Sequence, residues 1–505
     1  MSTIRRLDAS TGREPLFGVA ATRRIEAEAR RDASPFSLMA RAGDAVALLA
    51  LALAPHAGRI LVLAGPGNNG GDGLEAATRL RALGKDVTVL LLGEPAALPA
   101  DAAQAHARAR QAGVPVSPWP ATSQPMPGLV IDALLGLGTS RPPAGAIAEL
   151  IGLIADFAAR GVPVLAVDVP SGLDPERGQP LGDACVVAGH TLALIGARPG
   201  LFTAAGRDFA GTVWTDALGL DLDRHRPDAW LVGKGEIVRA AAPRRHAEHK
   251  GSFGDVAIVG GASGMAGAAI LAARAAHAAG AGRVFLDLLD AGAASLALDP
   301  GRPELMLRPG WWQGTAATIE QTTVVCGCGG GDAVRAALPR LLALAPRLVL
   351  DADALNAIAV DAGLQATLSA RLGRDRATVL TPHPLEAARL LGTTTHAVQA
   401  DRIGTATALA GRYRATVVLK GSGSVIAAPG DTPRICASGN ASLATAGTGD
   451  VLAGWIGGQW RAEASAFDVA TLCVVEHGAA AQPEQPGPLR AADLVERLYR
   501  RTREG

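Results

Sequence analysis

Residues 59–73 read RILVLAGPGNNGGDG and decide the fold of the first half of the chain. The apolar run Arg59–Ala64 is typical of a buried strand, and the glycines that follow predict a tight turn. Apolar residues at helical spacing then extend from Leu74 to Leu83 and stop at Gly84. A strand, a glycine-rich turn and a helix in this order predict an α/β fold with a ligand near the turn.

Three more strand-like runs follow in the first half: Asp86–Leu92, Leu129–Ala133 and Pro163–Val167. They alternate with helix-like segments, which is typical of a parallel sheet covered on both faces. We therefore expect a Rossmann-like, three-layer αβα sandwich whose site lies beyond the carboxyl ends of the strands.

A second α/β series begins near Gly254 and is expected to form an independent αβα domain. Its strongest predicted helix is Met265–Ala279, and its predicted strands are Thr323–Cys326, Arg347–Leu350, Thr378–Leu380 and Thr416–Leu419. Residues 219–248 show no strong pattern and contain Pro227 and Pro243, so we place the linker there. The predicted domains are residues 1–225 and 226–505.

Composition excludes several classes of protein. The 505 residues exceed what one core usually organises, and the net charge of +1 gives no general attraction to nucleic acid or an anionic membrane. The apolar run Ala45–Ala54 is too short to cross a bilayer and predicts a buried helix, and the polar first ten residues do not resemble a signal peptide. The five cysteines lack zinc-site spacing, so we expect reduced thiols in a cytoplasmic protein.

Polar side chains gather at the ends of the predicted strands of the first half. The side chains of Asn68, Asn69 and Asp72 exceed what a plain glycine turn needs. Asp132 ends one strand, and Asp168 ends the next, shortly before Ser171. Either acid alone could cap a helix, but together with Asn69 and Ser171 they favour an oxygen-rich site that suits a hard cation.

GPGNNGGDG, DALLGLGTSR and VDVPSGLD together resemble the N-terminal domain of the NAD(P)H-hydrate epimerase family. The resemblance runs from about Arg23 to TDALGL and implies binding of hydrated NADH or NADPH. It also implies a potassium ion held by Asn69, Asp132 and Ser171. The residues implied to bind the hydrated dinucleotide are Asn68, Asn69, Gly70, Gly71, Asp72, Gly136, Gly138, Arg141 and Asp168.

The implied reaction inverts the hydrated carbon of the dihydronicotinamide ring. Either the hydroxyl leaves and returns or the ring opens and closes, and both routes transfer protons beside a developing cation. Asp168 is the predicted acid/base, because a nearby carboxylate would also stabilise that cation.

Two motifs of the second half predict a phosphate-handling site. KGSGS (420–424) follows a strand and differs from the P-loop pattern, but a lysine beside glycine N–H groups suits polyphosphate. The alternative is a glycine hairpin with a surface lysine. In AGTGD (446–450) the glycines let N–H groups converge at a helix start, where Asp450 is either a base for an attacking hydroxyl or a helix cap.

GSFG, GMAGA, LDADALN, TPHP, KGSGS and AGTGDVLAG resemble the ribokinase-like superfamily and, more narrowly, NAD(P)H-hydrate dehydratase. The implied substrate contacts are Ala268, Gly329, His383 and Asp450. The implied nucleotide contacts are Lys420, Gly421, Ser422, Gly423, Ser424 and Gly449. Leu385 and the Cys326/Cys328 pair depart from the family pattern and put the local contacts of His383 and Gly329 in doubt, and His383 could instead be a structural loop residue.

The combined resemblance implies a bifunctional repair enzyme. The first domain would interconvert the R and S epimers of NADHX and NADPHX. The second would dehydrate the S epimer after Asp450 activates its hydroxyl for phosphorylation by ADP, the expected donor, or ATP with Mg²⁺. The alternative is a small-molecule kinase joined to a non-catalytic dinucleotide-binding domain. A homo-oligomer is also expected from the resemblance.

Overall fold

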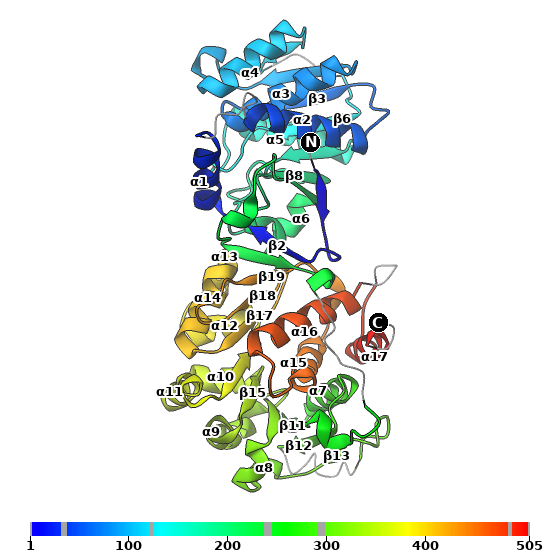
Figure 1. Cartoon of the computed structure of the whole chain (residues 1–505), viewed down its shortest axis with the longest axis vertical. Helices are drawn as coiled ribbons and strands as arrows, with labels where there is room; N and C mark the ends of the chain where they lie inside the picture. The colour runs from blue at the N-terminus through cyan, green and yellow to red at the C-terminus, as the bar shows by residue number, and fades with distance from the viewer. Residues whose placement is uncertain are drawn as a thin grey trace. The chain divides into compact units, whose positions relative to one another are not determined.

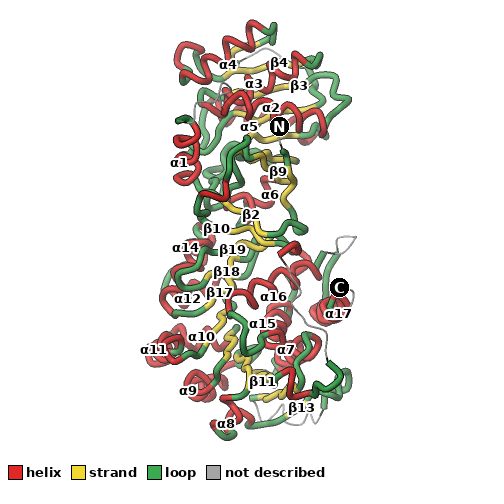
Figure 2. The backbone as a smooth tube through the Cα atoms, in the orientation of Figure 1, coloured by secondary structure: helices red, strands yellow, loops and turns green. Residues whose placement is uncertain are grey.

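The computed structural model describes residues 3–31, 38–120, 125–236, 245–289, 298–482 and 487–502. The chain forms two compact units, of which the first contains Met1–Asp8 and Glu14–Leu231 and the second Ala9–Arg13 and Val232–Gly505. Each unit is built around one β-sheet with helices packed against it (Figures 1 and 2). The expected mixed α/β fold with two sheets is confirmed.

The first unit contains an eight-stranded sheet in the order β1-β9-β8-β7-β6-β3-β4-β5. All neighbours are parallel apart from β1, which runs antiparallel to β9. In sheet order the strands are Arg5–Leu7, Thr212–Asp216, His190–Leu194, Val164–Val167, Leu129–Ala133, Ile60–Ala64, Val87–Leu91 and Val116–Pro118. The four strands predicted for this half occur as β3, β4, β6 and β7.

Helices cover both faces of this sheet. One face packs against α1 (Val19–Ala29), α2 (Leu38–Leu53), α3 (Asn68–Ala82) and α4 (Ala100–Gln111), and the other against α5 (Ala146–Ala159). Successive strand residues point to opposite faces, so Val62 and Ile131 join the first core and Leu63 and Val130 the second. The short helix α6 (Gly206–Ala210) also belongs to this unit. The neighbouring strands β2 (Arg13–Leu16) and β10 (Ala229–Val232) each cross the division of the chain into units, which falls after Arg13 and after Leu231.

The sheet of the second unit has the order β13-β12-β11-β14-β15-β16-β17-β18-β19. It is parallel from β13 to β17 and antiparallel from β17 to β19. In sheet order the strands are Met306–Leu307, Arg283–Leu288, Asp255–Gly260, Thr322–Cys326, Arg347–Leu350, Ala377–Leu380, Thr416–Leu419, Val425–Ala427 and Arg434–Cys436.

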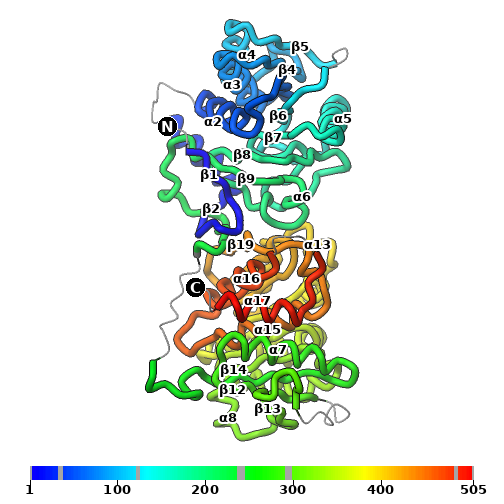
Figure 3. Tube along the Cα trace, turned by 90° about the vertical axis from the view of Figure 1, so that its right-hand side faces the viewer, coloured from blue at the N-terminus to red at the C-terminus, as the bar shows by residue number. Residues whose placement is uncertain are grey.

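This sheet is also covered on both faces. One face packs against α9 (Val334–Leu344), α10 (Asp353–Ala359), α11 (Ala362–Ala370), α12 (Pro384–Leu391) and α14 (Arg402–Tyr413). Figure 3 shows the other layer, which contains α7 (Ala266–Ala278), α15 (Thr448–Gln459), α16 (Ala466–Ala480) and α17 (Ala491–Arg501). Two short helices, α8 (Ala316–Glu320) and α13 (Thr395–Ala400), complete the unit. The predicted helix Met265–Ala279 occurs as α7.

The segment expected to contain the linker holds a short strand, β10, and the division between the units falls within it, after Leu231. Pro243 lies outside the described residues. The glycine-rich motif is not only a turn, because α3 begins at Asn68. A Cβ on Gly70 would lie 2.0 Å from the Gly65 carbonyl oxygen, so the missing side chain lets the helix start directly against the strand end.

The predicted buried apolar helix is present within α2, most of whose apolar side chains face the core. Among the helices of the described residues, none combines the length and apolarity needed to cross a bilayer. All five cysteines are free thiols.

Candidate active sites

Three loops of the first unit meet at one edge of its sheet. β7, β6 and β3 are adjacent and parallel, so their carboxyl ends lie side by side. Asp132 lies near the end of β6, Asp168 directly follows β7, and α3 follows β3. The structure therefore brings together the polar residues that the sequence placed at successive strand ends.

A buried cluster of oxygen atoms joins all three of these loops. Ser171 donates to Asp132 through its backbone N–H at 2.8 Å and its hydroxyl at 2.6 Å. The backbone N–H of Leu135 donates to Ser171 Oγ at 2.9 Å, and Asn69 Nδ2 donates to the Leu135 carbonyl at 2.9 Å. Asn69 Oδ1 is buried and has no hydrogen-bond partner among the described residues.

This cluster fits a monovalent cation. Burial raises the pKa of Asp132 to about 6, although bonds from Ser171 and Leu134 oppose that rise. A buried amide oxygen without a partner costs free energy unless a ligand, ion or water satisfies it. Asn69 Oδ1, the Asp132 carboxylate and Ser171 Oγ would supply oxygen ligands to potassium and so satisfy that atom.

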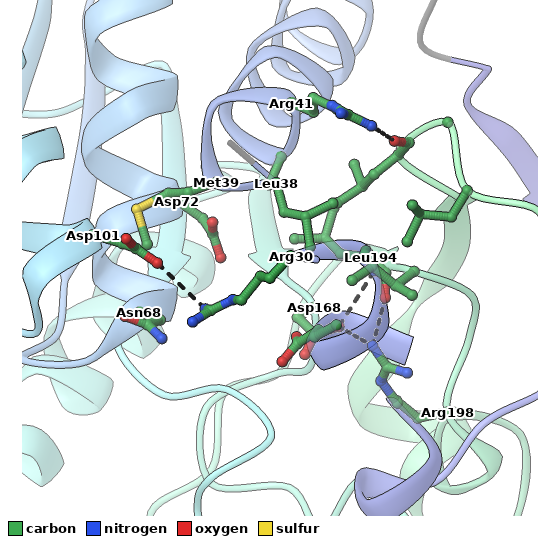
Figure 4. Close-up of a pocket in the computed structure, with 17 residues that line it drawn as sticks. Arg30, Leu38, Met39, Arg41, Asn68, Asp72, Asp101, Asp168, Leu194 and Arg198 are labelled. Atoms are coloured by element: carbon green, nitrogen blue, oxygen red, sulfur yellow. Dashed lines mark hydrogen bonds and ion pairs between the residues drawn. The ribbon is translucent and has the colours of Figure 1, made fainter. Parts of the chain in front are cut away.

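Two adjoining cavities lie above this edge, with volumes of about 520 and 440 Å³. Both are lined by Glu26, Asn68, Asp72 and Asp168, which therefore mark where they meet. Figure 4 shows Asn68, Asp72 and Asp101 on one side of the larger cavity and Asp168 and Arg198 on another. The pair of cavities forms one elongated, carboxylate-lined site.

Asp168 is held in an unusual backbone conformation, with φ of 67°. Its Oδ1 accepts from Arg198 Nη2 at 2.9 Å and from the Leu194 N–H at 3.3 Å. Arg198 is only 1% exposed and also donates to Thr22 and to the Phe17 carbonyl. A buried arginine thus fixes the carboxylate at the cavity wall, and positive φ in a residue other than glycine is often found at functional sites.

The other predicted residues of this site fall into three groups. Gly136 and Gly138 line the smaller cavity beside Asn68 and Asn69. Gly70 and Gly71 are buried in α3, where they allow close packing. Arg141 is exposed and is not among the described residues that line either cavity.

The second unit gathers its motifs at one sheet edge in the same way. β11, β14, β15, β16 and β17 are parallel neighbours, and the motif loops follow their carboxyl ends. Cys328 Sγ and carboxylate oxygens of Asp351 and Asp450 all lie within 4.8 Å of one another. Asp450 occupies the first turn of α15, whose N-cap Gly447 has φ of 91°. The proposed base therefore lies beside free N–H groups at a helix start.

Lys420 is the cation of this site. Its Nζ donates to Asp351 Oδ1 at 2.7 Å and lies 4.0 Å from Glu386 Oε2. The expected glycine hairpin does form between β17 and β18, but Lys420 is not a surface lysine, because its side chain is 19% exposed. A Cβ built on Gly449 would lie 3.2 Å from Nζ, so the ammonium group is close to the start of α15.

The charges around Asp450 adjust its proton affinity. Burial and then the negative charge of Asp351 raise the pKa of Asp450 to about 6, while Cys328 and Lys420 oppose the rise. Burial and the neighbouring carboxylates raise the pKa of the Cys328 thiol well above its usual range. Cys328 is therefore a neutral thiol hydrogen-bonded to Asp450, which is titratable near neutral pH.

His383 has the structural role that the sequence left open as one of two alternatives. Its Nδ1 accepts from the backbone N–H groups of Leu385 and Glu386 and so caps α12, while Nε2 lies 3.1 Å from Glu386 Oε1. Burial and Lys420 lower the pKa of His383. The ring remains about half exposed, so capping does not prevent a substrate contact.

The remaining predicted contacts occupy the edges of this site. Gly329 and Ala268 are adjacent, since a Cβ on Gly329 would lie 2.9 Å from Ala268 Cβ. Gly421, Ser422, Gly423 and Ser424 form the hairpin turn after Lys420. Leu385 is 44% exposed, so this departure from the family pattern does not crowd the site.

Sequence reasoning missed several groups that shape the two sites. Asp351 could have been found, because it follows a strand as Asp168 does. Nothing in the sequence indicates that Arg198 belongs to the site, because a fully buried arginine cannot be distinguished from a surface arginine in a sequence. Glu26 and Glu386 lie on helices, and their proximity to the sites depends on tertiary packing.

The fold and the two sites define a two-domain α/β protein with a carboxylate-lined cavity in one unit and a carboxylate–lysine site in the other. Residues 35–200 match the family described as YjeF-related protein N-terminus, and residues 256–498 match NAD(P)H-hydrate dehydratase. The chain is similar to two proteins named bifunctional NAD(P)H-hydrate repair enzyme. The Escherichia coli protein is 38% identical over 88% of this chain and 84% of its own length. The Coxiella burnetii protein is 35% identical over 92% of this chain and 94% of its own length.

The chain belongs to the family of bifunctional NAD(P)H-hydrate repair enzymes. Among solved structures, an ADP/ATP-dependent NAD(P)H-hydrate dehydratase from Bacillus subtilis, co-crystallised with ATP and Mg²⁺, is 28% identical with a TM-score of 0.44. That match covers 52% of this chain and 93% of the other.

Proposed function

We propose that this chain repairs hydrated NADH and NADPH through two activities. Residues 1–225 interconvert the R and S epimers, and residues 226–505 dehydrate the S epimer with the help of a phosphoryl donor. The observation that carries the dehydratase proposal is Asp450 at the start of α15, within 4.8 Å of Asp351, whose Oδ1 binds Lys420. A base, a cation and converging N–H groups are what phosphoryl transfer to a hydroxyl requires.

In the dehydratase reaction Asp450 accepts the proton of the substrate hydroxyl, whose oxygen then attacks the terminal phosphoryl group of ADP or ATP. The bond from that phosphorus to the bridging oxygen breaks, and AMP or ADP leaves. Lys420 and the N–H groups at the start of α15 stabilise negative charge on that group. The phosphorylated oxygen then leaves as phosphate, driven by the lone pair of the ring nitrogen, and dihydronicotinamide is restored. Ala268, Gly329 and His383 border the substrate, and residues 420–424 with Gly449 border the nucleotide.

In the epimerase reaction Asp168 exchanges a proton with the hydroxyl or water oxygen at the hydrated ring carbon. The elongated cavity provides space for the dinucleotide along Asn68–Asp72 and Gly136–Gly138. Arg198 keeps the Asp168 carboxylate at the wall, where it also stabilises positive charge on the ring. Arg141 would reach the substrate only from the exposed surface beside the smaller cavity.

Two metal ions belong to the proposal. Potassium bound by Asn69, Asp132 and Ser171 would hold three loops together and offset the charge of Asp132. Mg²⁺ would accompany the nucleotide phosphates, for which Asp351 and Asp450 supply the carboxylate oxygens that this ion prefers. We also propose a cytoplasmic location, since five free thiols suit a reducing compartment, and a homo-oligomeric state.

The experiment is to supply hydrated NADH with ADP or ATP and to follow both NADH absorbance and free phosphate. Recovery of NADH with one phosphate released per molecule supports the proposal, and the two nucleotides compared at equal concentration identify the preferred donor. A stable phosphorylated product without NADH would instead identify a small-molecule kinase. No conversion of hydrated NADH with either nucleotide would contradict the dehydratase proposal.

A further inference from the structure

We infer that Glu26 is a second catalytic carboxyl of the epimerase site and exchanges a proton with the substrate as the partner of Asp168. This inference rests on the proposed epimerase function. Glu26 lies on α1, outside every motif that the sequence analysis singled out. It nevertheless lines both cavities, as Asp168 does.

The contacts of α1 place Glu26 beside Asp168. Arg198 Nη1 donates to Thr22 Oγ1, and Arg198 Nη2 donates to Asp168 Oδ1 at 2.9 Å. Glu26 follows Thr22 by four residues, and residues four apart share one face of a helix. Thr22 and Glu26 therefore lie on the same face of α1, with Thr22 in contact with Arg198 and Glu26 at the junction of the two cavities.

The charged groups around Glu26 suit a residue that gains and loses a proton in each turnover. Burial, followed by the negative charge of Asp168, raises the pKa of Glu26. Three arginines oppose this rise, namely Arg198, Arg30 and Arg23. Acid–base catalysis is most effective when the pKa of the group lies near the operating pH. Burial and Asp168 favour the protonated form of Glu26, while the three arginines favour its ionised form.

Asp72, the other carboxyl shared by the cavities, has a different environment. Burial and the charge of Asp168 raise the pKa of Asp72 well above its usual range. Its other charged neighbours are also acidic, namely Glu26, Glu75 and Asp101. Because burial and these acidic neighbours all favour its protonated form, we assign Asp72 the role of a hydrogen-bond donor to the substrate rather than of a group that cycles.

The proposed step balances without another reactant. The Glu26 carboxylic acid gives its proton to the hydroxyl on the ring carbon, the C–O bond breaks with its electron pair on oxygen, and water leaves. The lone pair of the ring nitrogen forms a C=N bond. Water then adds to the opposite face, the C=N electron pair returns to nitrogen, and the Asp168 carboxylate takes the released proton. Glu26 ends ionised and Asp168 protonated, which is the starting state for the opposite epimer.

The test uses the full-length protein and one purified epimer of hydrated NADH, without nucleotide so that dehydration does not consume it. Interconversion is measured by chromatography for the wild type, Glu26→Gln, Glu26→Asp and Glu28→Gln. Glu28 is an exposed acid on the same helix and provides the matched control. Binding of the equilibrium epimer mixture is measured by calorimetry, and folding by thermal unfolding.

We expect Glu26→Gln to slow interconversion by about 10²–10⁴-fold while binding and folding stay normal. Glu26→Asp should recover part of the rate, and Glu28→Gln should match the wild type. The wild-type rate should fall at high pH as Glu26 ionises, and the residual rate of Glu26→Gln should lack this decline.

Three results would overturn the inference: a Glu26→Gln rate within threefold of the wild type, an equal loss in Glu28→Gln, or a loss explained by weaker binding alone. A wild-type protein that does not interconvert the epimers would contradict the epimerase function itself, and the role of Glu26 with it.

Discussion

Lys420 Nζ lies 2.7 Å from Asp351 Oδ1, whereas the sequence associated this lysine only with the glycine N–H groups that follow it. Asp351 is almost fully buried at the end of β15 and also accepts from Thr381 Oγ1 at 2.8 Å. The carboxylate therefore fixes the ammonium group near Gly449 at the start of α15. An ammonium group held in place before the nucleotide arrives needs less reorganisation during phosphoryl transfer.

Asp450→Asn should abolish dehydration while nucleotide binding persists. The variant keeps the backbone of α15 but lacks the group that takes the hydroxyl proton, so we expect a loss of about 10²–10⁴-fold in kcat. In the wild type, the rate should fall below pH 6 as Asp450, with a pKa of about 6, becomes protonated. Recovery of NADH absorbance across pH measures both effects. Near-normal turnover by the variant would show that Asp450 only caps the helix.

The fall of the dehydration rate at low pH is the acidic limb of the pH profile. Two substitutions beside Asp450 should shift this limb in opposite directions. Lys420 lowers and Asp351 raises the pKa of Asp450. Lys420→Met should therefore move the limb to higher pH, and Asp351→Asn should move it to lower pH. The measurement is the pH profile of kcat at saturating nucleotide. Lys250→Met, which changes an exposed lysine of the same unit, is the control and should leave the limb in place. Shifts in the same direction would contradict this account of the site.

The sheets were largely predictable from the sequence because their central strands are short, buried and apolar. β6, β15 and β17 have the predicted bounds, since RLVL and similar runs between polar segments fit only a doubly covered sheet. The edge strands β1, β5 and β13 were not predicted. Such strands are only two to three residues long, and pairing with a neighbour rather than their own pattern defines them.

The sites were predictable only where residues follow strands. Asp132, Asp168 and the motif of α3 converge because parallel strands bring their ends to one edge. The buried partner Arg198 and the helix residue Glu386 could not be predicted, because their positions depend on how helices and loops pack. Local sequence carries information on register and strand ends but little on such packing.

Gly70→Ala should destabilise the first unit, whereas Gly67→Ala should not. A Cβ at position 70 would lie 2.0 Å from the Gly65 carbonyl oxygen, while one at position 67 meets nothing within 4 Å. Both residues belong to the same glycine-rich segment, so they form a matched pair. We expect a loss of about 1–3 kcal/mol in the free energy of unfolding for Gly70→Ala, measured by denaturant titration. Equal stabilities would mean that α3 does not pack this closely on the strand end.

The oxygen cluster around Asp132 should be needed for epimerisation. If it holds potassium, Asp132→Ala removes the anionic ligand and should slow epimerisation sharply, while dehydration of the S epimer in the other unit continues. Asn69→Ala provides a milder variant, because it keeps the Asp132 carboxylate and, since Oδ1 has no hydrogen-bond partner among the described residues, breaks only the bond from Nδ2 to the Leu135 carbonyl. Lithium in place of potassium should reproduce part of both defects, since the smaller ion fits the ligand distances poorly.

The measurements are epimer interconversion by chromatography and the Tm of the protein in potassium and in lithium. An ion that binds only the folded state raises Tm, so potassium should stabilise the wild type and stabilise Asn69→Ala less. Asn69→Ala could instead epimerise normally and show an unchanged response of Tm to potassium. That result would show that the cluster binds no ion and that its hydrogen bonds only hold Ser171 against the end of β6. Loss of both activities in Asp132→Ala would mean that this variant is misfolded, and the result for Asn69→Ala would then decide the question.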